Sequence, residues 1–361
     1  MVGIVCFWDR TATPYLQKYE ELLSEAGINY EILFWNRSDT ARQTAPNETD
    51  ISFRPRCHPL LKLFDFFRWR KQALKILRAK QYDKLIILTT VPAVLLYDLL
   101  TRKYRGKFVL DIRDYTLERN FLFGRLVTNL IEASALAPIS SDGYREWLTP
   151  SDKLLINHNI TWTDRPTEER DYFATQPYRY TFVGNVRLDE QTLMVLRALK
   201  NNPRFSSGYV GRIMPNCDIE EICEREGIHN CEFRGEFHYT EKPDIYSRID
   251  LINAVYANAP AGKMSLGDST PIPNRLYDCV VFRVPIVCCK GTYLSEIVDR
   301  YSLGFAIDAY SDDVVACFER YVDTFDKEAF LRGCDAFLAI AQQEEAAFKE
   351  SLRKFLEEES Q

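Results

Sequence analysis

The stretch Pro273-Asn274-Arg275-Leu276-Tyr277-Asp278, followed by Val284-Pro285-Ile286-Val287, is the most informative part of the sequence. It predicts a loop, a helix that begins near Asn274, and then a buried strand. A cation beside the free N–H groups of a helix N-terminus suits the phosphates of a nucleoside diphosphate, and Asp278 could accept hydrogen bonds from ribose hydroxyls. The ordinary alternative is an amphipathic helix with an ion pair between positions i and i+3.

On both sides of this stretch, short apolar runs alternate with helical patterns. In the first half we expect strands at 2–8, 30–35, 84–89 and 108–112, and helices at 15–25, 60–80, 91–103 and 119–136. In the second half we expect strands at 180–183, 205–211, 231–234, 251–255, 286–289 and 304–307, with helices between them and a last helix from 327 onward. This alternation predicts an α/β protein with two Rossmann-like, doubly wound parallel sheets.

Length and composition agree with two globular domains. The chain has 361 residues, of which 46% are hydrophobic and 27% charged, so it can form real cores. Its net charge of -6 argues against nucleic-acid binding. The apolar stretch 85–100 is too short to span a bilayer, and the N-terminus lacks the features of a signal peptide. With ten cysteines and no Cys-x-x-Cys pair, we expect reduced thiols and a cytoplasmic location.

The polar segment 161–176 reads as an interdomain linker. We therefore expect one domain at 1–165, a second domain at 173–335, and a C-terminal helix at 336–361. Ligands of such sheets bind at the carboxyl ends of the strands, which favours the cleft between the two domains as the site.

The stretch 273–287 resembles the proline–lysine–aromatic–glutamate signature of retaining glycosyltransferases of family 4, which have the GT-B fold. The spacing from Pro273 to Pro285 matches, with Arg275 in the place of the usual lysine and Asp278 in that of glutamate. Weaker matches are Phe182–Arg187, Tyr209–Arg212 and Phe233–Gly235. The resemblance implies that the following residues contact the donor: Gly184, Phe233, Pro273, Asn274, Arg275, Leu276 and Asp278. It also implies that the domain at 1–165 binds the acceptor, that the domain at 173–335 binds the nucleotide sugar, and that the C-terminal helix packs back on the first domain.

The same resemblance implies a mechanism without a metal, in which cations and a helix N-terminus neutralise the leaving diphosphate. The candidates for that role are Arg187, Arg212 and Arg275, although Arg187 and Arg212 also suit ordinary surface positions after strands. Near the acceptor or the sugar we expect Asp9, Arg10, Arg113 and Asp114. For the last two, a charge network at a strand end is the alternative.

Three features depart from the family pattern. The glycine-rich loop after the first strand is replaced by Trp8–Thr11, Arg113 replaces a histidine, and Thr270 occupies the position of the first glutamate. The loop 261–270 before the motif, which holds two glycines, has the composition of a mobile segment that orders over the donor, or of a plain connection.

These observations favour a hexosyltransferase that uses a nucleotide sugar, such as a UDP- or GDP-sugar, as substrate and needs no further cofactor. A role in the synthesis of surface polysaccharide, on a glycan or lipid-linked acceptor, follows from the resemblance. Two alternatives remain open: a nucleotide-sugar epimerase of the same fold, and a catalytically silent scaffold.

The segment Arg54–Lys80 holds nine basic residues, one acid and many aromatic and aliphatic side chains. This composition suits the anionic inner face of a membrane, so we expect a peripheral contact there; a core-facing helix with a solvated outer side is the alternative. We expect no metal site, because the cysteines and histidines at 217–238 fit no zinc spacing. His158 is expected in a structural turn.

Overall fold

The computed structural model describes residues 1–10, 13–38, 44–56, 58–160 and 170–358. The chain divides into two compact units. Unit 1 comprises residues 1–158 and 343–361, and unit 2 comprises residues 159–342. The sequence analysis put the domain limits at 165 and 335; the expected linker at 161–176 lies mostly outside the described residues. Among those residues, no helix is both long and apolar enough to cross a membrane.

Unit 1 is built on a parallel five-stranded sheet with the order β3-β2-β1-β4-β5. A parallel pair, β6 and β7, continues beside β5 through isolated bridges. The strands are β1 Val2–Cys6, β2 Tyr30–Asn36, β3 Glu48–Ser52, β4 Lys84–Leu88, β5 Phe108–Asp111, β6 Ala137–Ile139 and β7 Leu154–Ile156. The helices are α1 Leu16–Glu25, α2 Pro59–Lys80, α3 Thr90–Leu95 and α4 Phe121–Ala133, with short helical turns η2 Leu99–Lys103 and η3 Asp142–Glu146.

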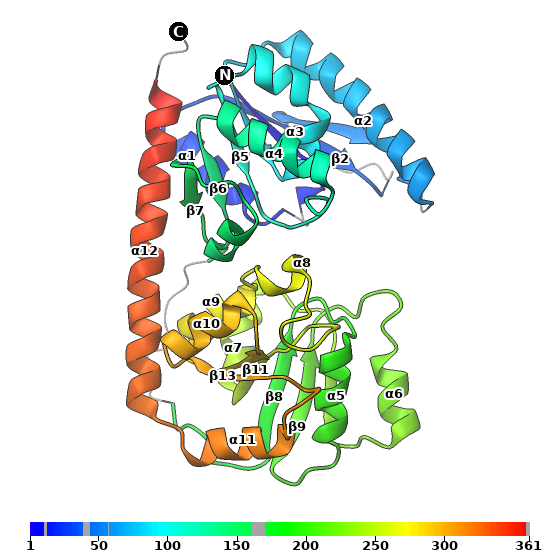
Figure 1. The fold of residues 1–361 in the computed structure, drawn as a ribbon, viewed down its shortest axis with the longest axis vertical. Helices are drawn as coiled ribbons and strands as arrows, with labels where there is room; N and C mark the ends of the chain where they lie inside the picture. Colours follow the sequence, from blue (N-terminus) through cyan, green and yellow to red (C-terminus); the bar gives the residue numbers. More distant parts are fainter. Residues whose placement is uncertain (11–12, 39–43, 57, 161–169, 359–361) are drawn as a thin grey trace. The chain divides into compact units, whose positions relative to one another are not determined.

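The side chains of β1 alternate between two cores, as expected for a strand covered on both faces. Val5 packs in the core formed with α2, α3 and α4, whereas Val2 and Ile4 pack in the core formed with α1. The C-terminal part of α12 (Lys327–Glu357) also joins this second core, through Phe348 and Leu352 among others. In Figure 1, α2, α3 and α4 cover one face of this sheet and α1 lies on the other.

Lys84 anchors the C-terminal end of α12 to unit 1. Its ammonium group donates hydrogen bonds to three of the last backbone carbonyls of the chain: those of Phe355, Leu356 (3.1 Å) and Glu358 (2.5 Å). The last carbonyls of a helix have no partners within the helix, and a cation there also opposes the negative end of the helix dipole. The contact helps to fix the return of the chain to unit 1.

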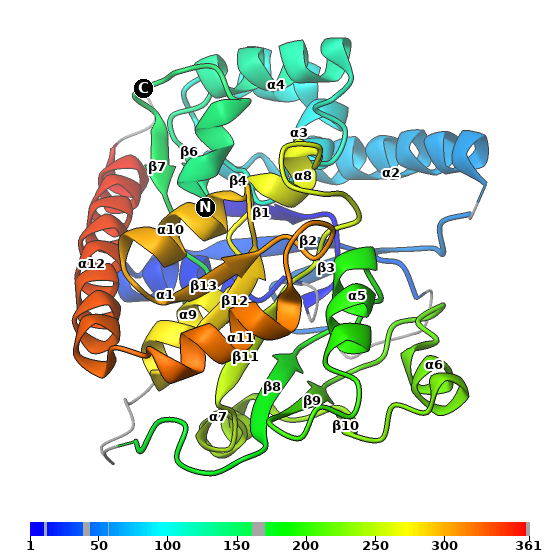
Figure 2. The same ribbon diagram turned by 60° about the horizontal axis from the view of Figure 1, so that its bottom comes forward.

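Unit 2 is a parallel six-stranded sheet with the doubly wound order β10-β9-β8-β11-β12-β13. Figure 2 shows β8, β11, β12 and β13 side by side in this order. The strands are β8 Tyr178–Val183, β9 Phe205–Val210, β10 Cys231–Arg234, β11 Leu251–Ala254, β12 Ile286–Cys289 and β13 Gly304–Ile307. The helices are α5 Glu190–Ala198, α6 Ile219–Glu226, α7 Lys242–Ser247, α8 Leu266–Ser269, α9 Asn274–Phe282, α10 Tyr293–Arg300 and α11 Val314–Asp323.

Helices cover both faces of the unit 2 sheet. One core joins the sheet to α9, α10 and the first part of α12, and the cores on the other face join it to α5, α6 and α11. The predicted α/β class with two doubly wound parallel sheets is thus confirmed.

Several local predictions were wrong. A single helix was expected over 91–103, but the chain forms α3 and then the π-type turn η2. The polar strand β3 and the helix α11 were not predicted. The expected loop 261–270 contains the short helix α8.

The long helix α12 gives a stability prediction at Gly333. Alanine normally stabilises a helix interior by about 1 kcal/mol relative to glycine. At Gly333, however, a Cβ atom would lie 1.6 Å from the backbone oxygen of Tyr301. We therefore expect Gly333→Ala to destabilise the protein, by about 2 to 3 kcal/mol. Urea unfolding measures the change, with the neighbouring exposed Arg332→Ala as the control. A stabilised Gly333→Ala variant would contradict this packing.

Candidate functional site

The carboxyl edge of the unit 2 sheet holds the residues of the signature stretch. Helix α9 begins there, after its N-cap residue Pro273, whose side chain forms no capping hydrogen bond. The first backbone N–H groups of such a helix are directed at the space before it and favour an anion. The predicted helix start is therefore present.

Two glycines allow the neighbouring strand ends to approach closely. Gly184 follows β8 and Gly211 follows β9. Their φ angles are 136° and 132°, values that residues with a side chain rarely adopt. A Cβ atom on Gly211 would lie 2.0 Å from the backbone oxygen of Gly184. A Cβ atom on Gly184 would lie 3.6 Å from Nη1 of Arg275. Gly184 thus borders the Arg275 guanidinium directly.

The Arg275 guanidinium lies over the rings of Phe182 and Tyr256, at 4.0 and 5.4 Å from their centroids. Its Nη1 donates a long hydrogen bond of 3.4 Å to the backbone oxygen of Val183. Its Nε is shielded from solvent and has no hydrogen-bond partner among the described residues. Burial lowers the pKa of Arg275, but an arginine remains charged in proteins. This is a desolvated cation with unused donors beside a helix N-terminus.

Asp278 does not pair with Arg275, so the simple i,i+3 ion pair is not formed among the described residues. Its carboxylate accepts hydrogen bonds from Nζ of Lys242 and from the hydroxyl of Tyr246, both at 2.7 Å. The Tyr246 ring stacks on Phe282 with centroids 4.7 Å apart. Burial, and then the charge of Asp278, raises the pKa of Tyr246 well above its usual value.

A small, solvent-open pocket of about 40 Å³ lies beside these groups in unit 2. Its lining is Asn159, Tyr239, Lys242, Asn274, Tyr277, Asp278, Val281 and Phe282. The sequence analysis had named Asn274 and Asp278 for the donor site. Lys242 was not predicted. It lies at the start of a short helix, and the sequence does not show that it pairs with an acid 36 residues later.

The other predicted donor residues have different surroundings. Arg187 is exposed, and Arg212 is exposed with only a loose ion pair to Glu236 at 3.8 Å. Phe233 stacks on Tyr209 with centroids 5.5 Å apart. Leu276 is fully buried in the core. Of the three cations proposed for the diphosphate, Arg187 and Arg212 are exposed, whereas Arg275 packs against two aromatic rings and a backbone carbonyl.

In unit 1, the charged residues expected near the acceptor are largely engaged with their neighbours. Arg10 forms ion pairs with Glu20 and Glu48, each at 2.6 Å. Asp9 accepts a hydrogen bond on its backbone oxygen from the Thr13 hydroxyl. Asp114 is exposed.

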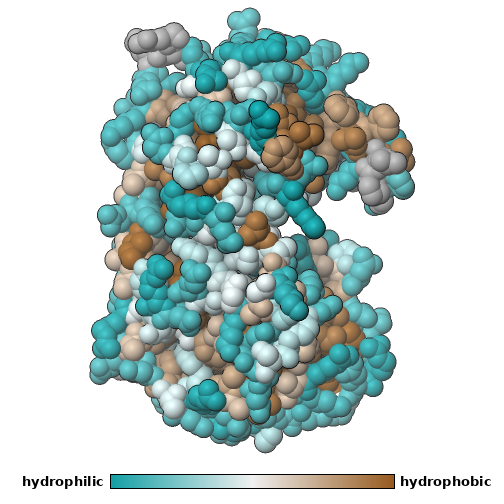
Figure 3. Space-filling model, in the orientation of Figure 1, coloured by the Kyte–Doolittle hydropathy of each residue, from teal (hydrophilic) through white to brown (hydrophobic). Residues whose placement is uncertain are grey.

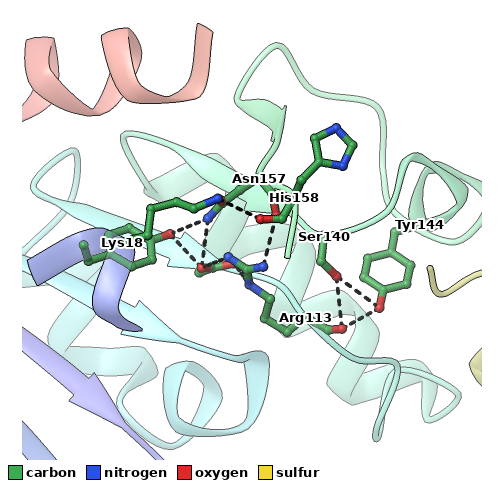
Figure 4. A network of polar contacts seen from close by, with 8 residues as sticks. Lys18, Arg113, Ser140, Tyr144, Asn157 and His158 are labelled. Carbon is green, nitrogen blue, oxygen red and sulfur yellow. Dashed lines mark hydrogen bonds and ion pairs between the residues drawn. The ribbon is translucent and has the colours of Figure 1, made fainter. Parts of the chain in front are cut away.

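Arg113 belongs to a buried polar network at the end of β5 (Figure 4). It forms an ion pair with Asp111 at 2.7 Å and donates a hydrogen bond of 3.0 Å to the backbone oxygen of Asn157. The hydroxyl of Tyr19 donates to the same carboxylate at 2.6 Å. Burial lowers the pKa of Arg113, but the charge of Asp111 more than restores it. These contacts match the alternative of a charge network at a strand end.

The network extends to Lys18 and His158, at the point where the chain leaves unit 1 (Figure 4). Lys18 donates hydrogen bonds to Oδ1 of Asn157 at 3.1 Å and to the backbone oxygen of His158 at 2.7 Å. It also pairs with Glu345 of α12, and His158 pairs with Glu344. Lys18 and His158 therefore fasten the returning α12 segment to the rest of unit 1.

Comparison with known proteins bears on the fold. No protein-family model matches the sequence, and no curated protein matches it significantly. Solved structures do match. Sucrose-phosphate synthase from Thermosynechococcus elongatus superposes with a TM-score of 0.70 at 12% identity, over 98% of both chains. The lipopolysaccharide outer core galactosyltransferase WaaB gives 0.64 at 12% identity, also over 98% of both chains.

A third match is HepE from Anabaena, solved with UDP and glucose, with a TM-score of 0.63 at 12% identity over 98% of this chain and all of the other. At these identities the likeness establishes the fold. The chain has the GT-B architecture expected from the signature stretch.

Removing Arg113 tests the buried network. Arg113→Ala leaves the Asp111 carboxylate buried without its counter-charge, so we expect a loss of about 3 to 5 kcal/mol in the free energy of unfolding. The control is Lys354→Ala, which removes an exposed i,i+4 pair and should cost less than about 1 kcal/mol. Similar urea midpoints for the two variants would contradict the network's structural role.

Lys18 makes the free energy of unfolding depend on pH. Burial lowers its pKa from 10.5 to about 8 in the folded protein. Between these values the unfolded chain binds more protons than the folded one, so Lys18 makes stability rise with pH there. Between pH 8 and pH 10 the stability of the wild type relative to Lys18→Met should increase by about 2 kcal/mol. Urea unfolding at a series of pH values measures this difference. A constant or shrinking difference would show that the lysine is not desolvated.

Proposed function

We propose that this protein is a glycosyltransferase that moves a sugar from a nucleotide-sugar donor to a glycan acceptor. The main support is the Arg275 guanidinium, desolvated and short of partners, beside the uncapped N-terminus of α9. A pyrophosphate would satisfy both sets of donors at once. A UDP-sugar is the favoured donor, since HepE was solved with UDP and a trehalose-6-phosphate protein from E. coli with UDP-2-fluoro glucose.

The proposed transfer step depends on stabilising the negative charge of the leaving diphosphate. As the bond between the sugar and the diphosphate breaks, negative charge grows on the departing phosphate oxygen, and preorganised donors lower that barrier. Arg275 and the α9 N–H groups would supply them, with Arg187 and Arg212 as further cations from the exposed loops after β8 and β9. The acceptor hydroxyl forms the new bond on the same face of the sugar and loses its proton to the departing phosphate. This step retains the anomeric configuration and requires no metal.

The groups that line the pocket beside α9 suit the ribose of the nucleotide. Asp278 accepts one hydrogen bond on each carboxylate oxygen, from Lys242 and from Tyr246. A carboxylate oxygen can accept a second bond, so ribose hydroxyls could still donate to it. Lys242 and Tyr246 would then hold the carboxylate in one orientation, a positioning role.

We further propose that the enzyme is a hexosyltransferase of surface polysaccharide synthesis. Its acceptor would be a lipid-linked glycan at the inner face of the plasma membrane. WaaB, among the structural matches, is described as a lipopolysaccharide galactosyltransferase. The basic segment Arg54–Lys80 supports a membrane location.

Arg275 tests the proposal. Arg275→Ala should weaken UDP binding by about 10- to 100-fold, the loss expected for a charged hydrogen bond to phosphate. Isothermal titration calorimetry measures the affinity. Arg225→Ala is the control, because it removes an exposed arginine of unit 2 on another helix. Unchanged affinity in Arg275→Ala, with an unchanged melting temperature, would refute the placement of the phosphates.

Turnover separates the alternatives. Incubation with UDP- and GDP-sugars should release free nucleoside diphosphate, at least slowly, by transfer to water. Interconverted sugar nucleotides without release would identify an epimerase instead. No binding of any donor would favour a scaffold.

A further inference from the structure

Unit 1 exposes a group of large apolar side chains on two segments. One segment is the N-terminal half of α2 and the other runs from Leu117 into the first turn of α4. We call the two together the apolar face; its members are Leu61, Leu63, Phe64, Phe67, Leu117, Phe121 and Leu122. Phe121 is 78% exposed, Leu122 69% and Phe64 64%. Single exposed apolar residues are ordinary, but a group of this size marks an interaction site.

These side chains do not form part of the core of unit 1. The inner side of α2 is formed by other residues, among them Trp69, Ala73 and Leu77, which are all buried. Asp65, on the same helix, is buried and held by Arg56 at 2.9 Å. The register of α2 is therefore fixed by its inner contacts, and Phe64 and Phe67 remain outside.

The two segments belong to one layer of unit 1. Helix α2 packs against α3, and α3 packs against α4. In Figure 3, hydrophobic side chains gather over α2 and, beside it, over the start of α4. Residues of both segments can thus meet one extended surface.

The charges around the apolar face are predominantly positive. Eight exposed basic residues lie on or next to the two segments: Arg54, Arg56, Lys62, Arg68, Lys71, Lys75, Arg119 and Arg125. The nearby acids are fewer. Asp65 is buried, Glu118 accepts hydrogen bonds from Thr90 and Thr116, and Asp114 is exposed.

We infer that the apolar face binds the surface of an anionic phospholipid membrane. Leucine and phenylalanine side chains would enter the boundary between headgroups and acyl chains, while the surrounding lysines and arginines would meet lipid phosphates. The charge complementarity favours lipid over a second copy of this chain, because two copies would bring like charges together. The inference deepens the membrane location proposed above, on which it rests, and is separate from the proposed transfer reaction. It also adds the 117–122 segment to the helix that the sequence indicated.

The experiment is co-sedimentation of the full chain with lipid vesicles, without donor or acceptor. Vesicles of phosphatidylcholine containing about a third phosphatidylglycerol are compared with phosphatidylcholine alone. The first variant is Phe121→Asp with Leu122→Asp, and the second is Phe64→Asp with Phe67→Asp. The matched control is Ile340→Asp, which changes an apolar residue of α12 that is 40% exposed.

We expect the wild type and Ile340→Asp to bind the anionic vesicles, more weakly at high salt. Each double variant should bind about tenfold less or weaker still, with an unchanged melting temperature. Equal binding by the double variants, or no binding by the wild type, would overturn the inference. So would self-association of the wild type that the double variants abolish, which would make the face a dimer interface. Vesicle binding does not depend on UDP binding. The experiment therefore tests the membrane surface separately from the proposed transfer reaction.

Discussion

A single desolvated cation is the constraint on which the site in unit 2 depends. Arg275 lies against two aromatic rings, with a backbone carbonyl at long range and a buried Nε without a partner among the described residues. A buried donor without a hydrogen-bond partner destabilises the folded protein, so such a group needs an explanation, and a bound ligand that accepts the hydrogen bond is one. The uncapped start of α9 has the same character. The unpaired Arg275 Nε and the start of α9 together are the basis of the proposed anionic ligand.

The surrounding structure serves to place that cation. Gly184 lets the end of β8 lie beside the guanidinium, and Gly211 lets β9 follow it closely. Asp278, one turn further along α9, is drawn away from Arg275 by Lys242 and Tyr246. If Asp278 paired with Arg275 instead, the positive charge would be neutralised internally. With these contacts, Arg275 has no acidic partner within the described part of the chain.

Much of the fold and of the candidate site was predictable from the sequence. The rest was not predictable, and the reasons are physical. The buried strands and α9 were predicted because apolar runs and the proline-led helix start are local signals. The strand β3 was missed because Glu48, Thr49 and Asp50 show no apolar alternation. The break after α3 follows from contacts rather than from composition. The partners of Asp278 lie more than thirty residues away, and so does Asn157, which accepts a hydrogen bond from Arg113; a sequence does not show which distant groups meet. The exposure of Phe121 and Leu122 was hidden for the same reason, since an apolar residue at a helix start normally suggests burial.

The most direct measurement is a crystal structure of the protein with UDP. The account predicts that oxygens of the β-phosphate lie about 3 Å from the Arg275 guanidinium and from the first N–H groups of α9. It also predicts the ribose beside Asp278. UDP bound elsewhere on the chain, or a β-phosphate out of reach of Arg275, would contradict it.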